Sequence, residues 1–220
     1  MSRKKSVKYQ IAKELNRIIQ DPKPFYFQSK GNWKRGYFKN NHDLVVELGC
    51  GKGEYSNGLA RFFPKKNFLG VDIKGDRLVA GGMVAEKEGL NNVAFLRIPL
   101  SRMEDFFEEE EIDEIWITFP DPRPKDRDEK KRLTNPYFLG KYGKLLKKGG
   151  VLHLKTDSES LFEYSLEILE GLKLDWRIEK LTRDLYQSPY LNDHYGIKTR
   201  FEGIFSEKGY SIKYLSITKI

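Results

Sequence analysis

From residue 43 onward, the sequence alternates short apolar runs with longer segments of helical periodicity, and this alternation restricts the fold more than any other feature. The apolar runs are 44–48, 68–71, 93–98, 112–118 and 151–154, and the helical segments are 53–63, 75–89, 134–147 and 158–170. Strands and helices in this order predict right-handed crossovers and an α/β fold, a mostly parallel sheet with helices on both faces. Segment 211–218 alternates apolar and polar residues and precedes no helix. We expect it to add an antiparallel C-terminal strand.

The basic excess of the chain is confined to its first 40 residues. These contain 11 Lys and Arg against 2 Asp and Glu, whereas residues 41–220 contain 29 against 30. Such a segment attracts a polyanion such as nucleic acid, although a solubilising arm has the same composition. Apolar side chains at helical spacing predict an amphipathic helix over residues 6–20. We therefore expect a basic N-terminal arm, 1–40, and a single domain, 41–220.

The composition of the chain indicates the cellular compartment in which the protein works. The only cysteine, Cys50, excludes an internal disulfide framework and suits a reducing cytosol. No uncharged apolar run approaches the length of a membrane span, and no apolar signal core follows the basic N-terminus. We expect a cytoplasmic protein.

A glycine-rich turn follows the first predicted strand of the domain, in Glu47-Leu-Gly-Cys-Gly-Lys-Gly53. Glycines allow a tight turn and a close approach of backbone N–H groups to a ligand. The spacing differs from the dinucleotide fingerprint, because Glu54 stands where a glycine is required. The next strand ends in Asp72, which is placed to bind the ribose hydroxyls of an adenosine ligand. An acid beside the glycines suits the cationic amino-acid part of S-adenosylmethionine, and the pattern resembles Rossmann-like methyltransferases that use it. A structural turn with an unremarkable Asp72 is the alternative.

A proline loop, Phe119-Pro-Asp-Pro-Arg-Pro-Lys125, follows the fourth strand. Its prolines fix the backbone on both sides of Asp121, which makes this carboxylate a candidate site residue, although a rigid turn with a solvated Asp would look the same. The charged run 126–132 comes next and fits either a solvated surface or a phosphate-contact segment.

Two further polar segments follow. In 155–159, Asp157 and Ser158 are candidates either for a site or for a helix cap. In 198–205, charged residues and a hydroxyl alternate with apolar residues, which fits either a site or the edge of a strand.

Taken together and in order, these motifs resemble the bacterial tRNA (guanine-N(7)-)-methyltransferase family. The resemblance covers about residues 43–205, and the proline loop and Thr199-Arg-Phe-Glu202 are its most particular parts. It implies a Rossmann-like fold, S-adenosylmethionine as cofactor, and tRNA as the substrate that is methylated at N7 of a variable-loop guanine. It also implies no metal and no membrane, and we expect a monomer or homodimer.

The resemblance assigns roles by position. Asp121 is the expected catalytic acid and also a cofactor residue. The other cofactor residues are Glu47, Gly49, Gly51, Gly53, Asp72 and Pro99; the substrate residues are Lys125, Asp157, Thr199, Arg200, Phe201 and Glu202; the RNA-contact residues are Arg127, Lys130, Lys131 and Arg132.

Two positions depart from the family pattern. Arg123 stands where the family usually has Trp, and Pro99 follows the third strand where an acid or amide is usual. Two other functions remain compatible with the residues. One is a methyltransferase that acts on another RNA or on a small molecule, and the other is a non-catalytic RNA-binding protein.

Overall fold

A single eight-stranded sheet organises the computed structural model, which describes residues 10–172 and 175–220. The strands are β1 (Ile18–Ile19), β2 (Asp43–Leu48), β3 (Lys66–Asp72), β4 (Val93–Arg97), β5 (Ile112–Thr118), β6 (Leu146–Thr156), β7 (Trp176–Thr182) and β8 (Lys213–Lys219). Their spatial order is β1-β4-β3-β2-β5-β6-β8-β7. Every described pairing is parallel except the two that β8 makes with β6 and β7. The predicted Rossmann-like sheet with an antiparallel C-terminal strand is confirmed.

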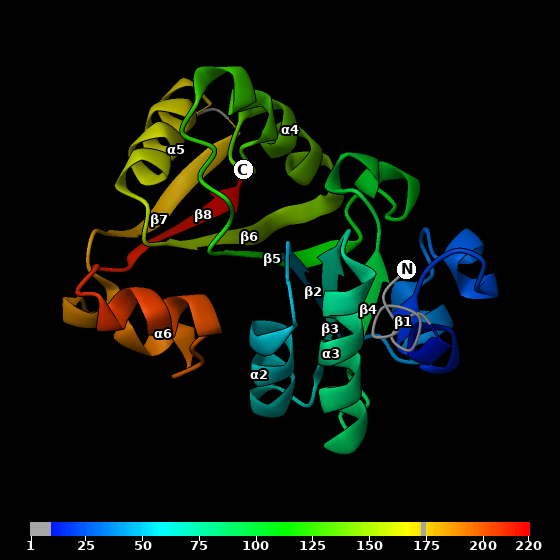
Figure 1. The fold of residues 1–220 in the computed structure, drawn as a ribbon. Helices are drawn as coiled ribbons and strands as arrows, with labels where there is room; N and C mark the ends of the chain where they lie inside the picture. The colour runs from blue at the N-terminus through cyan, green and yellow to red at the C-terminus, as the bar shows by residue number, and fades with distance from the viewer. Residues whose placement is uncertain (1–9, 173–174) are drawn as a thin grey trace.

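Helices cover both faces of this sheet. They are α2 (Glu54–Phe62), α3 (Gly75–Lys87), α4 (Pro136–Leu145), α5 (Glu159–Gly171) and α6 (Arg200–Glu207). Figure 1 shows α4 and α5 on one face and α2, α3 and α6 on the other. Local caps explain where two of them begin: the Asn135 side chain accepts from Phe138 N at the start of α4, and Ser158 accepts from Leu161 N at the start of α5. No helix in the described part of the chain is long and apolar enough to cross a membrane.

The central strands are apolar throughout because both of their faces are buried. Within β2, Val46 and Leu48 belong to the core beneath α4 and α5, and Val45 belongs to the core beneath α2 and α3. Glu47 lies on the same face of the sheet as Val45, beneath α2 and α3, and is only 3% exposed. A carboxylate therefore lies within an otherwise apolar strand.

The N-terminal segment corrects our expectation of a helix over 6–20. Within the described residues the helix covers only 10–14, and Ile18–Ile19 form β1 at the edge of the sheet beside β4. The two isoleucines point to opposite faces of the sheet, and each is buried in a different core. An extended backbone buries both, which one face of a helix would not do. Residues 6–9 of the predicted helix lie outside the described part.

Residues 24–37 continue along this edge of the molecule as short helical turns. Trp33 is fully buried, its indole N–H donates to the carbonyl of Phe106 at 2.9 Å, and its ring stacks on Phe107. This part of the basic segment is therefore anchored to the core. The domain boundary at residue 40 stays a prediction.

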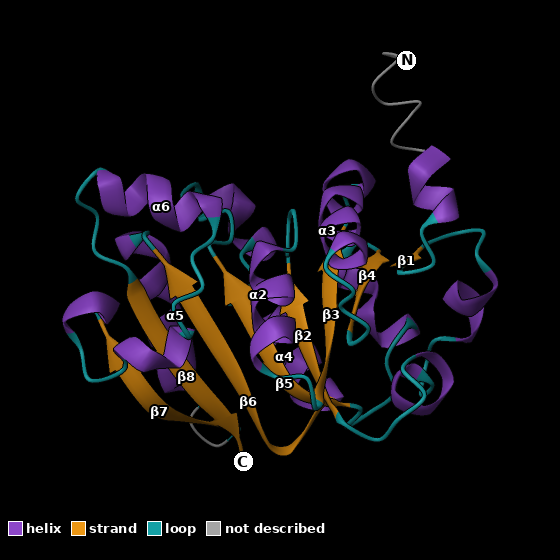
Figure 2. Cartoon of the chain, turned by 90° about the horizontal axis from the view of Figure 1, so that it is seen from below, coloured by secondary structure: helices purple, strands orange, loops and turns teal. Residues whose placement is uncertain are grey.

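The order of the strands determines where a ligand would bind. From β2 the chain runs outward through β3 to β4 and then returns to the other side of β2 as β5. A crevice opens at such a reversal, beyond the carboxyl ends of the strands. Figure 2 shows α6 at the edge of the sheet where the parallel strands end. The predicted site residues follow β2, β3, β4, β5 and β6 and begin α6, so they belong to this edge.

Candidate active site

The glycine loop between β2 and α2 adopts a conformation that only glycine tolerates without strain. Gly49, Gly51 and Gly53 have φ angles of +72°, +56° and +68°. A Cβ on Gly53 would lie 2.3 Å from the ring of Phe95, so this glycine is also required for packing. A Cβ on Gly51 would meet no protein atom within 4 Å. The loop therefore has a packed side and an open side.

Asp72 ties the loop to the end of β3. One carboxylate oxygen accepts from Gly51 N at 3.0 Å, and the other accepts from Lys74 N at 2.8 Å. The carboxylate is thus oriented beside the open face of the loop. Backbone N–H groups, an open glycine and a fixed carboxylate suit a ligand that carries a ribose. The residues present therefore fit S-adenosylmethionine.

Glu47 lies inside the protein rather than on the open face of the loop. Its carboxylate accepts from Ser56 N at 2.9 Å, from the Ser56 hydroxyl at 2.5 Å and from the Thr118 hydroxyl at 2.7 Å. Burial raises its pKa to about 7, against the opposing effect of these three donors. Glu47 therefore joins β2, α2 and β5 beneath the loop. Its direct contact with a cofactor stays a prediction.

The environment of the neighbouring Cys50 indicates a packing role for this residue. Its thiol is buried, and burial raises the pKa well above its usual value, which disfavours the thiolate.

The proline loop after β5 presents Asp121 to solvent. The backbone is left-handed on both sides of this residue, with φ of +50° at Phe119 and +48° at Arg123. Residues other than glycine rarely adopt this backbone conformation, and such strain is often found at functional sites. Asp121 is exposed, and its carboxylate forms an ion pair with the Arg123 guanidinium at 3.0 Å. Arg123, which stands where the family usually has Trp, therefore contacts the expected catalytic acid.

In the charged run that follows, some basic residues are exposed on the surface and others contact neighbouring residues. Arg127 and Lys130 are exposed on the short helical segment Asp126–Lys131, whereas Lys131 forms an ion pair with Asp128. Arg132 donates from Nε to the carbonyl of Arg123 at 3.1 Å, and its guanidinium lies 4.3 Å from the ring centroid of Tyr164. Arg132 therefore braces the proline loop. Lys125 is exposed at the start of the segment.

After β6, the roles of Asp157 and Ser158 separate. Ser158 caps α5, so the capping role does not belong to Asp157. Asp157 is half-buried, and burial raises the pKa of its carboxyl group, although nearby Lys213 opposes the shift. The amine of Lys213 donates to the backbone carbonyl of Asp157 at 3.0 Å.

The segment 198–205 is not the edge of a strand, because most of it forms α6. Thr199 caps this helix by accepting from Glu202 N, and Glu202 reaches back to Thr199 N, which is a complete capping box. This Thr-x-x-Glu signal was present in the sequence, where the apolar alternation obscured it. In the first turn, Arg200 and Phe201 are exposed, whereas Thr199 and Glu202 are buried.

Three contacts join α6, the glycine loop, the proline loop and the end of β6. Arg200 N donates to the Glu54 carboxylate at 2.8 Å, which joins α6 to the start of α2. Phe119 N donates to the carbonyl of Lys155 at 2.8 Å, and the rings of Phe119 and Phe205 stack with centroids 6.5 Å apart. The glycine loop, the proline loop and α6 are therefore neighbours.

Pro99 is further from this group along the sheet. It follows β4, is partly exposed and precedes the short helical segment Leu100–Asp105. Within the described residues, no set of three or more His, Cys, Asp or Glu side chains is grouped to hold a metal ion.

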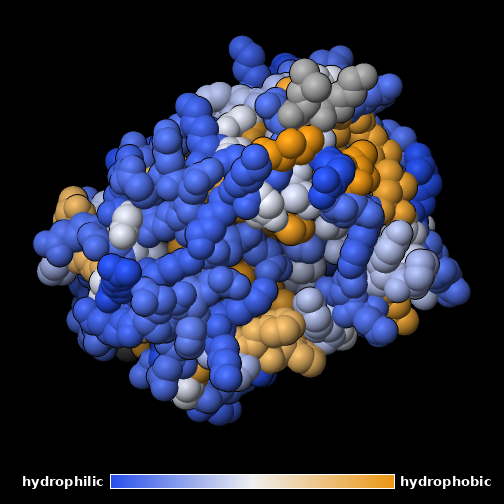
Figure 3. Space-filling model, turned by 180° about the vertical axis from the view of Figure 1, so that it is seen from behind, coloured by the Kyte–Doolittle hydropathy of each residue, from blue (hydrophilic) through white to orange (hydrophobic). Residues whose placement is uncertain are grey.

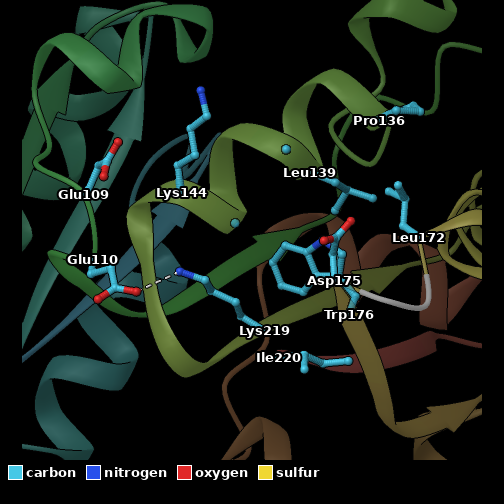
Figure 4. A pocket seen from close by; sticks show the side chains of 12 residues that line it. Glu109, Glu110, Pro136, Leu139, Lys144, Leu172, Asp175, Trp176, Lys219 and Ile220 are labelled. Atoms are coloured by element: carbon cyan, nitrogen blue, oxygen red, sulfur yellow. Dashed lines mark hydrogen bonds and ion pairs between the residues drawn. The ribbon is translucent and has the colours of Figure 1, made fainter.

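Two cavities lie apart from the candidate site residues. One, of about 530 Å³, is shown in Figure 4, where Lys219 points toward Glu110 and pairs with it at 3.1 Å. The other, of about 610 Å³, lies between α5 and β7 and includes Ile178 and Leu181. Figure 3 shows the molecule from behind the view of Figure 1, with apolar residues gathered at the upper right. None of the predicted site residues lines either cavity.

Comparison with known proteins identifies the family to which this sequence is similar. Residues 41–215 match a family described as "Putative methyltransferase". The tRNA (guanine-N(7)-)-methyltransferase of Cytophaga hutchinsonii is 42% identical over 98% of this chain and 97% of its own length. The enzyme of the same name from Bacteroides fragilis is 46% identical over 86% of this chain and 73% of its own length.

Solved structures share the fold at low identity. The 16S rRNA methyltransferase KamB has a TM-score of 0.64 at 13% identity and covers 91% of this chain and 95% of its own. A 16S rRNA (adenine(1408)-N(1))-methyltransferase with cosubstrate SAM has a TM-score of 0.59 at 12% identity, over 94% and 95% of the two chains. At such identities, the likeness concerns the fold alone.

Proposed function

The chain belongs to the tRNA (guanine-N(7)-)-methyltransferase family, and we propose that it transfers a methyl group from S-adenosylmethionine to N7 of a guanine in the variable loop of tRNA. The observation that carries this proposal is the convergence of three segments at one edge of the sheet. The glycine loop with Asp72 forms one side, the proline loop with Asp121 forms the second, and the first turn of α6 forms the third.

The cofactor would lie against the open face of the glycine loop. Gly51 leaves that space free, Gly49 and Gly53 shape the turn, and Asp72 offers a fixed carboxylate to ribose hydroxyls. Glu47 supports the loop from beneath, and Pro99 follows the strand next to β3. When bound, S-adenosylmethionine supplies a methyl group activated by its sulfonium.

Guanine N7 carries an in-plane lone pair and no proton, so the protein needs no general base at this atom. Its main task is to hold N7 in line with the methyl group, and positioning of this kind contributes about 7–11 kcal/mol. Positive charge develops on the guanine during transfer. We propose that Asp121 stabilises this charge, since a preoriented carboxylate near a developing cation lowers the barrier.

Substrate recognition is assigned to the residues around Asp121. Lys125 and Arg200 are exposed cations suited to phosphate or to the guanine 6-oxo group, and Phe201 offers an exposed ring. Asp157 is suited to accept from the guanine N1–H and amino group. Thr199 and Glu202 contribute to the same surface by forming the cap of α6.

The wider tRNA contact is electrostatic. We propose that Arg127 and Lys130, with Lys131 and Arg132 beside them, contact phosphates, because these basic residues directly follow the proline loop. The basic segment 1–40 adds long-range attraction. We place the enzyme in the cytoplasm with its substrate.

A pair of transcripts tests this proposal. One is an unmodified tRNA, and the other is identical except that 7-deazaguanosine replaces the variable-loop guanosine and removes the accepting nitrogen. We expect transfer of labelled methyl to the first and none to the second. Equal transfer to both would show that another atom is methylated.

A further inference from the structure

Lys155 is a cation with no access to solvent. It lies near the end of β6, and both its side chain and that of Glu202 are 0% exposed. Lys155 Nζ lies 2.9 Å from each oxygen of the Glu202 carboxylate. Burial lowers the pKa of this lysine, and Glu202 opposes the shift. Buried ion pairs contribute little net stability, since desolvation offsets their attraction. The pair therefore calls for an explanation other than stability.

The surroundings of Lys155 connect the three segments of the candidate site. Its ammonium lies 5.0 Å from the ring centroid of Tyr55 in the first turn of α2, and 5.9 Å from that of Phe119. Its backbone carbonyl accepts from Phe119 N at 2.8 Å. Phe119 is the left-handed residue that begins the proline loop, two positions before Asp121. One side chain thus touches the helix that follows the glycine loop and the base of the proline loop.

Glu202 extends this connection to α6. Besides Lys155, its carboxylate accepts from the Tyr186 hydroxyl at 2.9 Å and from Thr199 N at 3.4 Å. A buried carboxylate with these partners is not available to a substrate in this structure. It instead determines where the neighbouring exposed residues, Arg200 and Phe201, lie relative to the rest of the site.

We propose that Lys155 is a positioning residue for methyl transfer. It acts through Glu202 on the first turn of α6, and through Phe119 on the loop that carries Asp121. Its buried head has no route to tRNA, so its effect is to keep the substrate-facing segment and the catalytic loop in register above the cofactor. The functional half of this inference rests on the proposed function, whereas the structural half does not.

Hydrogen exchange tests the structural half without any substrate. The variants are Lys155→Met, which leaves Glu202 unpaired, and Lys155→Met with Glu202→Leu, which removes both charges. A matched control is Glu159→Gln, which breaks the half-exposed Lys213–Glu159 pair at the same edge. In Lys155→Met we expect amide exchange to rise at least tenfold in α6 and at Phe119, with α3 unchanged. A uniform rise, or no rise in α6, would overturn the inference.

Single-turnover kinetics test the functional half. For the double variant, which restores an uncharged core, we expect transfer to tRNA to fall at least 30-fold while the Kd for S-adenosylmethionine changes less than threefold. A folded double variant with wild-type transfer would overturn the positioning role. The control should match wild type in both measurements. If wild-type protein itself fails to methylate tRNA, the proposed function fails, and exchange alone decides whether Lys155 organises the site.

Discussion

The Thr118 hydroxyl donates a 2.7 Å hydrogen bond to the buried Glu47 carboxylate, across the boundary between β5 and β2. This bond joins the strand that leads into the glycine loop to the strand that leads into the proline loop. Ser56 of α2 donates to the other oxygen of the same carboxylate. The two loops on which the proposed chemistry depends are therefore fixed to each other at the point where the strand order reverses.

Glu47 should make stability decrease as the pH rises toward neutrality. Its pKa is about 7 in the folded protein and near 4.5 in the unfolded chain, so unfolding releases a proton between these values. Raising the pH from 4.5 to 7 should thus lower its contribution to the free energy of unfolding by about 3 kcal/mol. Urea denaturation of wild type and Glu47→Gln across this range measures the difference. Parallel pH dependences for the two proteins would contradict this prediction.

Alanine at two glycines of the same loop should separate packing from ligand binding. Gly53→Ala places a methyl against Phe95 in a left-handed backbone, and we expect a loss of about 3 kcal/mol in stability. Gly51→Ala carries only the backbone strain, about 1 kcal/mol, but its methyl enters the open face. We expect affinity for S-adenosylmethionine to fall about tenfold in Gly51→Ala. Calorimetry gives both affinities, and unchanged binding in Gly51→Ala would place the cofactor elsewhere.

Loss of the Asp121 charge should affect transfer far more than cofactor binding. Asp121→Asn keeps the size of the side chain but removes the charge that would stabilise the methylated base. We expect the single-turnover rate to fall by about 100- to 1,000-fold, which is the usual effect of removing one preoriented electrostatic group. The Kd for S-adenosylmethionine should change only a few-fold. Asp126→Asn, at an exposed acid nearby, serves as the control and should transfer normally.

The exposed cations after the proline loop should contribute to the salt dependence of tRNA binding. In Arg127→Ala with Lys130→Ala, binding should weaken, and the slope of log affinity against log salt should decrease by roughly one per lost phosphate contact. Lys65→Ala, an exposed cation next to the amino end of β3, is the matched control. Filter binding over a salt series measures the slope. A slope unchanged in the double variant would remove this segment from the interface.

Most of the sheet could be predicted because its central strands are buried on both faces and are followed by helices with clear periodicity. The predicted strand 112–118 matches β5 residue for residue, and 44–48 misses only Asp43 of β2. The edges were harder. Two residues suffice for β1, and β7 carries charges at Arg177, Glu179 and Lys180, so neither has the apolar signal of a buried strand.

The positions of the candidate site could be predicted, but their surroundings could not. Strand ends indicated Asp72, Asp121 and Asp157, and the structure places all of them at one edge of the sheet. That Glu47 and Glu202 are enclosed by protein donors depends on contacts over 71 and 47 residues of sequence separation, to Thr118 and Lys155. Only the folded chain reveals such partners. The same holds for Arg123, whose ion pair with Asp121 depends on a left-handed backbone that its residue type does not predict.

Analysis of the nucleosides in methylated tRNA is the most direct test of the proposed reaction. An unmodified transcript is incubated with the protein and labelled S-adenosylmethionine, and the label is then mapped to a nucleoside and a position. We expect N7-methylguanosine at one guanine of the variable loop, with the yield lost in Asp121→Asn. A label on another nucleoside, or an equal yield from that variant, would contradict the proposed reaction.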